Sequence, residues 1–327
     1  MKALICPELG DEDVLRVEEL PSPACGPNQV RIGARAAAVN FPDNLVIRGQ
    51  YQYQYDPPFV PGHECAGTLL EVGSDVEGFS VGDRVLAMTG TGAFASEVVA
   101  KPPRSDHVFR IPDSMGWDEA AAFDLTYGTA ILGFRRGQLA AGESVLVLGA
   151  AGGTGTAAIQ VAKAMGAYVV GAAGGAEKLA IAKEAGADAV VDYREEGLSA
   201  AVKEFTGGRG VDVVFDPVGG TEFREYLRCL AWNGRYLVIG FAAGEIPNVG
   251  LNLVLLKSVS LVGVAYGASA RLDPDGTKRD FDQLFDWYEA GLLKPVIGHR
   301  FPLDQGADAM RVVWNRGAHG KVVIDID

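Results

Sequence analysis

The sequence predicts an α/β protein with two domains, one rich in β-strands and one built on a doubly wound parallel sheet of six strands. The chain has 327 residues, more than a single compact core usually holds. Residues 1 to about 120 contain short segments of alternating polarity between Gly, Pro and Asp turns, which is typical of strands. From residue 144 onward, apolar β-branched runs alternate with alanine-rich stretches, which is typical of buried parallel strands joined by helices.

In the β-rich part, strands are predicted from "QVRIGARAAAVN" at 29–40 and from "AGTLLEVGS" at 66–74. The stretch "VEGFSVGDRVLAM" at 76–88 predicts a turn at Gly82 and Asp83 that leads into another strand.

The second part has the strand and helix pattern of a complete dinucleotide-binding fold. Its predicted strands span 144–150, 167–173, 188–193, 211–217, 235–241 and 258–265. Helices are predicted at 154–166 and 176–186, and each closes on a glycine suited to the left-handed position after a helix. An amphipathic helix is predicted at 280–293, and the last strand, "GKVVIDID", is expected to pair back in the first domain.

Composition excludes several classes of protein. Hydrophobic residues make up 48% of the chain and charged residues 22%, which is ordinary for a globular protein. The net charge of −13 argues against a nucleic-acid partner or an anionic membrane. We expect no membrane span and no signal peptide, because no apolar run approaches the necessary length. The four cysteines lie far apart without any CxxC pair, which predicts a reduced cytoplasmic protein.

The strongest chemical motif is "VLVLGAAGGTGTAAIQVA" at 145–162, in which a buried strand runs through a glycine cluster into a helix. Such a turn lets the backbone approach a pyrophosphate at the helix N-terminus, and it assigns this role to Gly152, Gly153, Thr154 and Gly155. Alanine stands at the first glycine position of the G-x-G-x-x-G pattern, so an ordinary strand-to-helix turn is the alternative. The six surrounding strands favour cofactor binding.

The residues after the second strand of this sheet indicate which dinucleotide binds. NAD-binding proteins usually place an acid there, to accept hydrogen bonds from the ribose hydroxyls. The segment "VVGAAGGAEK" has no acid at the strand end, and small residues such as Gly174 leave room for a 2′-phosphate. Lys178, and Arg194 after the third strand, could balance the phosphate charge, and a solvated side chain is the alternative for each. We therefore expect NADPH.

Four motifs together resemble the medium-chain dehydrogenase/reductase superfamily, and most closely its zinc-independent quinone oxidoreductase branch. They are "AAVNFPDNLVIRGQY", "PFVPGHECAG", "GAAGGTGTAAIQVAKAMGA" and "GKVVI", and the resemblance covers nearly the whole chain. It implies a GroES-like catalytic domain formed by residues 1–123 and 266–327, and a Rossmann domain formed by residues 124–265. It also implies an active-site cleft between the domains, NADPH as hydride donor, and a homodimer for which "LVGVA" at 261–265 is a candidate edge.

The "PGHE" motif contains His63 and Glu64 and is followed by Cys65, all residue types that bind zinc. Zinc-dependent relatives place a cysteine ligand near position 40, where this chain has Asn40, and the stretch "AMTGTGAFASEVV" lacks the cysteines of a structural zinc lobe. We therefore expect no zinc. His63 and Glu64 are expected to bond neighbouring backbone, and Cys65 to be a small buried hydrophobe.

The resemblance also assigns catalytic residues. Asn40 and Asp43 of "NFPD" are expected to line the nicotinamide end of the cleft. Tyr51 matches the tyrosine that lies near the acceptor in the family and could donate a hydrogen bond or a proton. The neighbouring Tyr53 and Tyr55 leave this assignment open, as does the alternative of a solvent-exposed aromatic loop.

Further cofactor contacts follow from the same resemblance. Thr126 resembles the residue that contacts the nicotinamide ribose, and Tyr193 resembles one that flanks the adenine. Gly240 and Phe241 are expected to pass the nicotinamide side of the cofactor. Lys321 of "GKVVI" has no clear role, and a lysine that faces water is an equal interpretation.

The expected chemistry is hydride transfer from NADPH without a metal. Hydride transfer leaves negative charge on the acceptor oxygen, so a metal-free enzyme needs hydrogen-bond donors and an acceptor that delocalises charge. A quinone fits best. An enone, an enal or an enoyl-thioester of the acryloyl-CoA type is the alternative, and a non-catalytic NADPH-binding protein is the alternative from another class.

Overall fold

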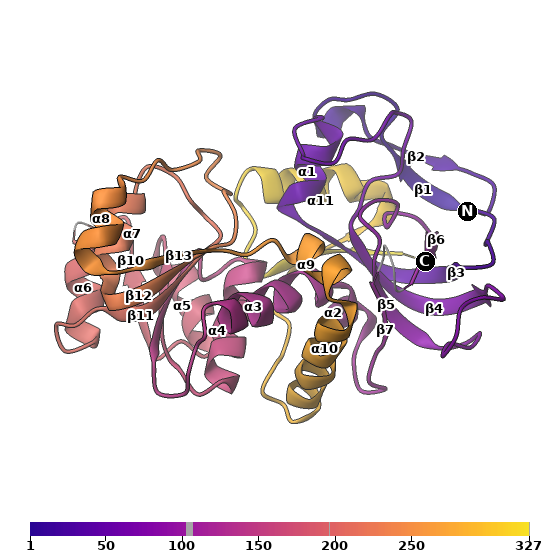
Figure 1. Ribbon diagram of the computed structural model, residues 1–327. Helices are drawn as coiled ribbons and strands as arrows, with labels where there is room; N and C mark the ends of the chain where they lie inside the picture. Colours follow the sequence, from indigo (N-terminus) through magenta and orange to yellow (C-terminus); the bar gives the residue numbers. More distant parts are fainter. Residues whose placement is uncertain (103–106, 196, 327) are drawn as a thin grey trace. The chain divides into compact units, whose positions relative to one another are not determined.

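The computed structural model describes residues 1–102, 107–195 and 197–326 (Figure 1). The chain divides into two compact units. The first unit comprises Met1–Leu125, Ser269–Phe281 and Pro295–Asp327, and the second comprises Thr126–Ala268 and Asp282–Lys294.

The first unit is β-rich, as the sequence predicts. Its strands are β1 (Lys2–Ile5), β2 (Arg16–Glu19), β3 (Val30–Val39), β4 (Glu64–Val72), β5 (Arg84–Met88), β6 (Glu97–Ala100), β7 (His107–Arg110), β14 (Ile297–Pro302) and β15 (Lys321–Asp325). Its helices are α1 (Phe41–Ile47), α2 (Trp117–Ala121) and α11 (Gly306–Trp314), with 3₁₀ turns η1 (Glu12–Val14) and η2 (Leu303–Gln305).

Most strands of this unit form one sheet in the order β14-β15-β3-β4-β5-β7, with β6 paired to β3, while β1 and β2 form a separate pair. The C-terminal strand β15 pairs antiparallel with β3 and parallel with β14, which confirms that the end of the chain returns to the first domain. The predicted turn ahead of β5 is also present, because Gly82 has a φ of 94°.

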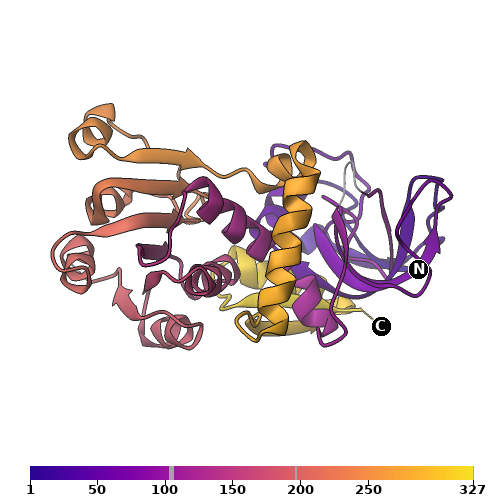
Figure 2. The same cartoon turned by 60° about the horizontal axis from the view of Figure 1, so that its bottom comes forward.

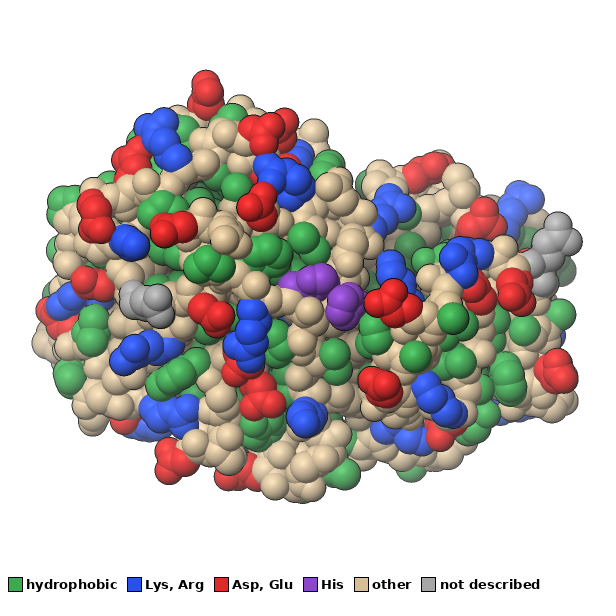
Figure 3. All heavy atoms as spheres, turned by 180° about the vertical axis from the view of Figure 1, so that it is seen from behind, with side chains coloured by type: hydrophobic (Ala, Val, Ile, Leu, Met, Phe, Trp, Pro, Cys, Tyr) green, Lys and Arg blue, Asp and Glu red, His purple; other side chains and the backbone are tan. Residues whose placement is uncertain are grey.

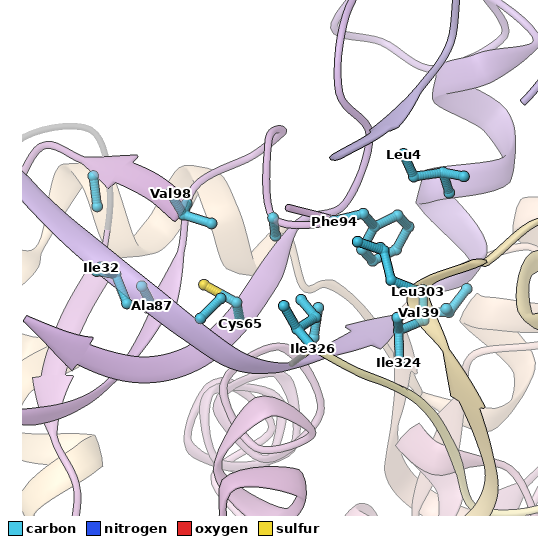
Figure 4. Packing of buried hydrophobic residues seen from close by; sticks show 14 of the residues in the cluster. Leu4, Ile32, Val39, Cys65, Ala87, Phe94, Val98, Leu303, Ile324 and Ile326 are labelled. Carbon is cyan, nitrogen blue, oxygen red and sulfur yellow. The ribbon is translucent and has the colours of Figure 1, made fainter. Parts of the chain in front are cut away.

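A large apolar core lies within the first unit, and Figure 4 shows Cys65 among its side chains. The alternating pattern of β3 sends Val30, Ile32 and Ala34 into this core. Cys65 is fully buried, and burial raises the pKa of its thiol to about 12. It is therefore the small buried hydrophobe that the sequence predicts.

The second unit contains the predicted parallel sheet in the order β10-β9-β8-β11-β12-β13. Its strands are β8 (Ser144–Leu148), β9 (Tyr168–Ala173), β10 (Ala189–Asp192), β11 (Val211–Asp216), β12 (Leu230–Val238) and β13 (Ser260–Gly263), all paired in parallel. This arrangement confirms the α/β fold class. The fifth strand begins earlier than predicted, because Leu230 already pairs with Val211 before the pairing register shifts.

The remaining helices are α3 (Asp124–Arg136), α4 (Gly153–Ala164), α5 (Ala176–Glu184), α6 (Leu198–Phe205), α7 (Phe223–Cys229), α8 (Leu251–Lys257), α9 (Tyr266–Leu272) and α10 (Pro274–Glu289). Positive φ angles at Gly166 and Gly186 confirm the predicted ends of α4 and α5. Figure 2 shows α10 as a long orange helix. It starts before the predicted residue 280, at Pro274, because proline is favoured in the first helical turn.

Three further findings concern membrane-spanning helices, the cysteines and the surface charge. Within the described ranges, no helix is both long and apolar enough to cross a bilayer. All four cysteines are free thiols. Acidic and basic side chains lie interspersed over the face shown in Figure 3.

Candidate functional sites in the two units

A buried polar cluster lies in the first unit, where three strand ends come together. Asn40 follows β3, Glu64 begins β4 and Lys321 begins β15. The strand registers explain the meeting, because Ala38 pairs with Glu64 and Val39 pairs with Val322. Residues far apart in the sequence therefore share one site.

Lys321, Asn40 and Glu64 form a closed hydrogen-bonded triad. The ammonium Nζ of Lys321 donates to Asn40 Oδ1 at 2.6 Å and to Glu64 Oε1 at 2.8 Å. The amide Nδ2 of Asn40 donates to Glu64 Oε1 at 2.9 Å and to the Ala38 carbonyl at 3.2 Å. The second carboxylate oxygen of Glu64 accepts the N–H of Leu125 at 2.9 Å. Each buried charge thus has a charged partner and further hydrogen bonds.

This triad changes the roles expected from the sequence. Lys321 is only 5% exposed, so it does not face water. Glu64 bonds side chains from distant strands rather than neighbouring backbone. Its pKa is raised, because the effect of burial exceeds the lowering effect of the Lys321 charge. Both amide hydrogens of Asn40 are used inside the cluster, so Asn40 has no spare donor for a substrate.

Asp43 and His63 form a second buried pair beside the triad. Asp43 is fully buried, and its Oδ2 accepts the Asn40 N–H at 2.7 Å at the start of α1. Its Oδ1 lies 2.5 Å from His63 Nδ1. In the tautomer whose Nδ1–H donates to this carboxylate oxygen, Nε2 is the acceptor of the ring. His63 therefore bonds a side chain rather than the neighbouring backbone that the sequence suggested.

Of the three tyrosines in "YQYQY", Tyr51 packs against this pair. Its ring meets the His63 ring edge-on, with centroids 5.7 Å apart and planes at 90°. The hydroxyl of Tyr53 instead accepts a hydrogen bond from Arg271, and that of Tyr55 lies 3.5 Å from the Gly90 carbonyl. Burial is the first cause that raises the pKa of Tyr51, followed by the charges of Tyr53 and Asp43. Tyr51 therefore keeps its proton at neutral pH, and its hydroxyl is a hydrogen-bond donor.

In the second unit, the turn between β8 and α4 has the geometry of a phosphate-binding loop. Gly149 has a φ of 60°, and its carbonyl accepts the Gly152 N–H at 3.0 Å. A side chain at Gly155 would lie 2.2 Å from the Gly149 carbonyl oxygen, so glycine is required there for helix and strand to pack. The tight-turn glycine is thus Gly149 itself, which explains why Ala150 interrupts the expected pattern.

The first turn of α4 presents its N–H groups at this loop. The first intrahelical bond runs from the Thr156 N–H to the Gly152 carbonyl at 2.9 Å. The N–H groups of Gly153, Thr154 and Gly155 precede it and have no partner within the helix. They are the groups that would hold a pyrophosphate.

The turn after β9 has an acid that the sequence pattern did not reveal. Asp192, at the end of the neighbouring strand β10, accepts the Gly175 N–H at 2.9 Å. The same carboxylate binds Arg194 Nη2 at 2.6 Å, and this hydrogen bond is the main cause that lowers the pKa of Asp192. A side chain at Gly174 would lie 3.1 Å from the Tyr193 hydroxyl, so Tyr193 rests on this glycine turn.

Arg194 also covers the turn, because a side chain at Gly175 would lie 3.0 Å from its guanidinium. Lys178 stands in the first turn of α5, directly after these glycines. The two cations named from the sequence are therefore both placed at the end of β9, next to the predicted cofactor residue Gly174.

The predicted cofactor residues share one edge of the parallel sheet. Gly152 to Gly155 follow β8, Gly174 and Lys178 follow β9, Tyr193 follows β10, and Gly240 and Phe241 follow β12. Carboxyl ends of parallel strands are where such folds bind dinucleotides. Thr126 is the exception, since it is buried in α3 rather than placed at a strand end.

Comparison with known proteins identifies relatives along the whole chain. Residues 26–113 match the alcohol dehydrogenase GroES-like domain, and residues 153–289 match the zinc-binding dehydrogenase model. A quinone oxidoreductase-like protein 2 homolog of Nematostella vectensis is 39% identical, over 99% of this chain and 88% of its own length.

Solved structures agree over the same length. A probable oxidoreductase from Mycobacterium abscessus has a TM-score of 0.90 and 38% identity, covering 99% of this chain and 98% of its own. The Escherichia coli quinone oxidoreductase complexed with NADPH has a TM-score of 0.91 and 28% identity, covering 99% of this chain and 100% of its own.

The side chains at the polar cluster do not fit a zinc ion, although one matching model is described as zinc-binding. His63 Nδ1 is bonded to Asp43, and Glu64 is bonded to Lys321. Asn40 offers a neutral amide where a thiolate would be needed. Across the part of the chain that the structure describes, no three His, Cys, Asp or Glu side chains come together as metal ligands.

Proposed function

The chain belongs to the quinone oxidoreductase-like branch of the medium-chain dehydrogenase/reductase superfamily, and on that premise we propose that it transfers a hydride from NADPH to a quinone without a metal. One observation carries this proposal: the turns expected to bind the cofactor all lie at the carboxyl edge of the parallel sheet. The Escherichia coli relative, which is named a quinone oxidoreductase and was solved with NADPH, supports it.

The second unit would bind and orient the dinucleotide. The N–H groups at the start of α4 suit the pyrophosphate, and Arg194 over the Gly174–Gly175 turn suits a 2′-phosphate. Asp192 bonds the same glycine turn, but its charge is balanced by Arg194. The nearby cations therefore favour the phosphorylated cofactor over NAD.

The first unit would supply the proton donor for the reaction. NADPH supplies the hydride when it is bound. Tyr51 is the donor to the acceptor oxygen, because its phenol remains protonated and it lies against His63. Asp43 fixes the orientation of His63, and the Lys321 triad fixes Asn40, whose N–H in turn holds Asp43. Asn40 and Asp43 thus position the donor rather than contact the acceptor.

A conjugated acceptor suits this donor set. Without a Lewis acid, developing negative charge must be met by one phenol and by delocalisation within the acceptor itself. A quinone supplies that delocalisation through its ring. We also place the protein in the cytoplasm, since all four thiols are free and three of them are buried.

The test measures NADPH oxidation at 340 nm with a quinone, an enone and an enoyl-CoA in parallel. We expect turnover with the quinone, and a loss of at least about a hundredfold in kcat on Tyr51→Phe, the lower end of what a general acid usually contributes. Tyr53→Phe is the matched control and should retain wild-type kcat. Preferred turnover of the enone or the enoyl-CoA would reassign the substrate. Stoichiometric zinc in the purified protein would overturn the metal-free mechanism.

A further inference from the structure

Asp216 is a buried acid in the second unit that the proposed reaction does not use. It ends β11 and is 2% exposed. Its Oδ1 accepts the N–H of Val218 at 2.7 Å and that of Gly219 at 2.9 Å. Its Oδ2 accepts the hydroxyl of Tyr236 on β12. Burial and the nearby Asp216 raise the pKa of Tyr236, so this phenol keeps its proton and donates.

The first loop that Asp216 holds, residues 217–220, lies against the phosphate-binding turn. A side chain at Gly149 would lie 3.1 Å from Cγ2 of Val218. Gly149 is the tight-turn glycine between β8 and α4, so Val218 forms a wall of that turn. Moving Val218 would move the boundary of the pyrophosphate site.

The loop of residues 217–220 also contacts a second loop, residues 240–245, which contains Phe241. Three backbone bonds join the two loops, from Ala242 to Pro217 at 3.1 Å, from Ala243 to Val218 at 2.8 Å and from Gly220 to Glu245 at 3.0 Å. In addition, a side chain at Gly219 would lie only 2.9 Å from the Phe241 ring. The position of Phe241 therefore depends on the loop below it.

We propose that Asp216 is a positioning residue that sets the spacing between the phosphate-binding turn and the Phe241 loop, and so orients the nicotinamide half of the cofactor. The inference rests on the proposed NADPH function. One carboxylate holds Val218 against Gly149 and Gly219 beneath Phe241. Asp216 acts through these two loops and does not itself touch the cofactor.

The adenine end of the site is held by different residues. Asp192, Arg194 and the Gly174–Gly175 turn contact one another, whereas the Asp216 carboxylate bonds Val218, Gly219 and Tyr236. Loss of the Asp216 carboxylate should therefore affect the intact dinucleotide more than a ligand that fills the adenine end alone. Adenosine 2′,5′-bisphosphate is such a ligand, since it lacks the nicotinamide half.

The experiment compares binding of NADPH, followed by its fluorescence, with binding of adenosine 2′,5′-bisphosphate by calorimetry. Asp216→Ala should weaken NADPH binding about tenfold or more, because two buried N–H groups lose their acceptor. Its effect on the bisphosphate should stay below about threefold. Asp216→Asn should rescue NADPH binding, since the amide oxygen accepts the same two N–H groups and the amide nitrogen can donate to the Tyr236 oxygen.

Asp212→Ala is the matched control on the same strand. Asp212 lies near the start of β11, at the opposite end from Asp216, and bonds Ser144 and Arg209. Its loss removes a comparable number of hydrogen bonds, but it should leave both ligands bound as in the wild type. If Asp216→Ala does not fold, Tyr236→Phe serves as a second test. We expect this variant to bind NADPH more weakly and the bisphosphate nearly as well as the wild type.

The outcomes separate this inference from the proposed function. If the wild type binds NADPH but Asp216→Ala or Tyr236→Phe binds it equally well, the positioning role is wrong and the proposed function stands. Equal losses for both ligands would also overturn the role, because they would indicate a general loss of structure. A wild type that binds neither ligand would overturn the proposed function, and this inference with it.

Discussion

Lys321 carries a positive charge in a buried site, and Glu64 is the negative charge that balances it. Their atoms lie 2.8 Å apart, with side chains 6% and 1% exposed. Removing one partner of such a pair leaves an uncompensated charge and costs roughly 3–5 kcal/mol. Lys321→Met should therefore lower the free energy of unfolding by about that amount, measured by urea denaturation.

The double variant Lys321→Met, Glu64→Gln tests the cause of this loss. It removes both charges and keeps an amide oxygen for the Asn40 bond, so it should recover part of the stability. Lys163→Met is the matched control, because Lys163 and Asp188 form a pair of similar length but far greater exposure. That control should cost less than about 1 kcal/mol. Equal losses for the two lysines would contradict a special role for the buried charge.

Single residues were also where the sequence misled most. Lys321 and Asn40 are 281 positions apart, and only the pairing of β15 with β3 brings them together. Hydrophobic periodicity identifies a strand but not its register, so it could not reveal this triad. The available signal was a lysine at the first position of an apolar terminal strand, where a buried charge requires a partner.

At the scale of elements, the turns after β9 and β10 determine which dinucleotide fits. Arg194 should be released from Asp192 to bind a 2′-phosphate, which forms stronger charge-assisted bonds. Arg194→Ala should therefore raise the dissociation constant for NADPH about tenfold and that for NADH less than about twofold. Lys178→Ala should show the same selectivity. Fluorescence titration with both cofactors measures it.

Arg209→Ala is the matched control for this turn. Arg209 pairs with Asp212 and is 60% exposed, against 61% for Arg194, but it lies before β11 rather than after β10. It should leave the affinity for both cofactors unchanged. Equal weakening of NADPH and NADH by Arg194→Ala would remove the 2′-phosphate assignment.

The elements themselves were largely predictable, because burial imposes a period on each of them. The six strands of the parallel sheet, and the glycines that close α4 and α5, lie where apolar runs and turn residues placed them. Contacts between elements were not predictable in the same way. For example, β9 itself ends without the acid that NAD-binding proteins usually have there. The acid at this turn is Asp192 on the neighbouring strand β10, because parallel pairing sets Asp192 opposite Ala173.

At the scale of the whole molecule, the second unit exposes several leucines next to one edge of its parallel sheet. The edge strand β13 carries the exposed Leu261, and α8 just before it exposes Leu251, Leu255 and Leu256 by 74%, 78% and 69%. An open strand edge beside exposed leucines is a natural surface for a second copy of the chain. We propose that this surface forms a homodimer.

Leu255→Lys should shift the protein toward monomer in sedimentation velocity. Burying one leucine contributes about 1.5–3 kcal/mol, and a twofold interface uses each residue twice, so dimer affinity should fall by roughly 10² to 10⁴. Val81→Lys is the control, because Val81 is 66% exposed but lies in the first unit. NADPH affinity of the Leu255→Lys monomer should stay unchanged, since α8 carries none of the cofactor residues. A wild type that sediments as a monomer at micromolar concentration would contradict the homodimer, and a dimer that survives Leu255→Lys would move its interface elsewhere.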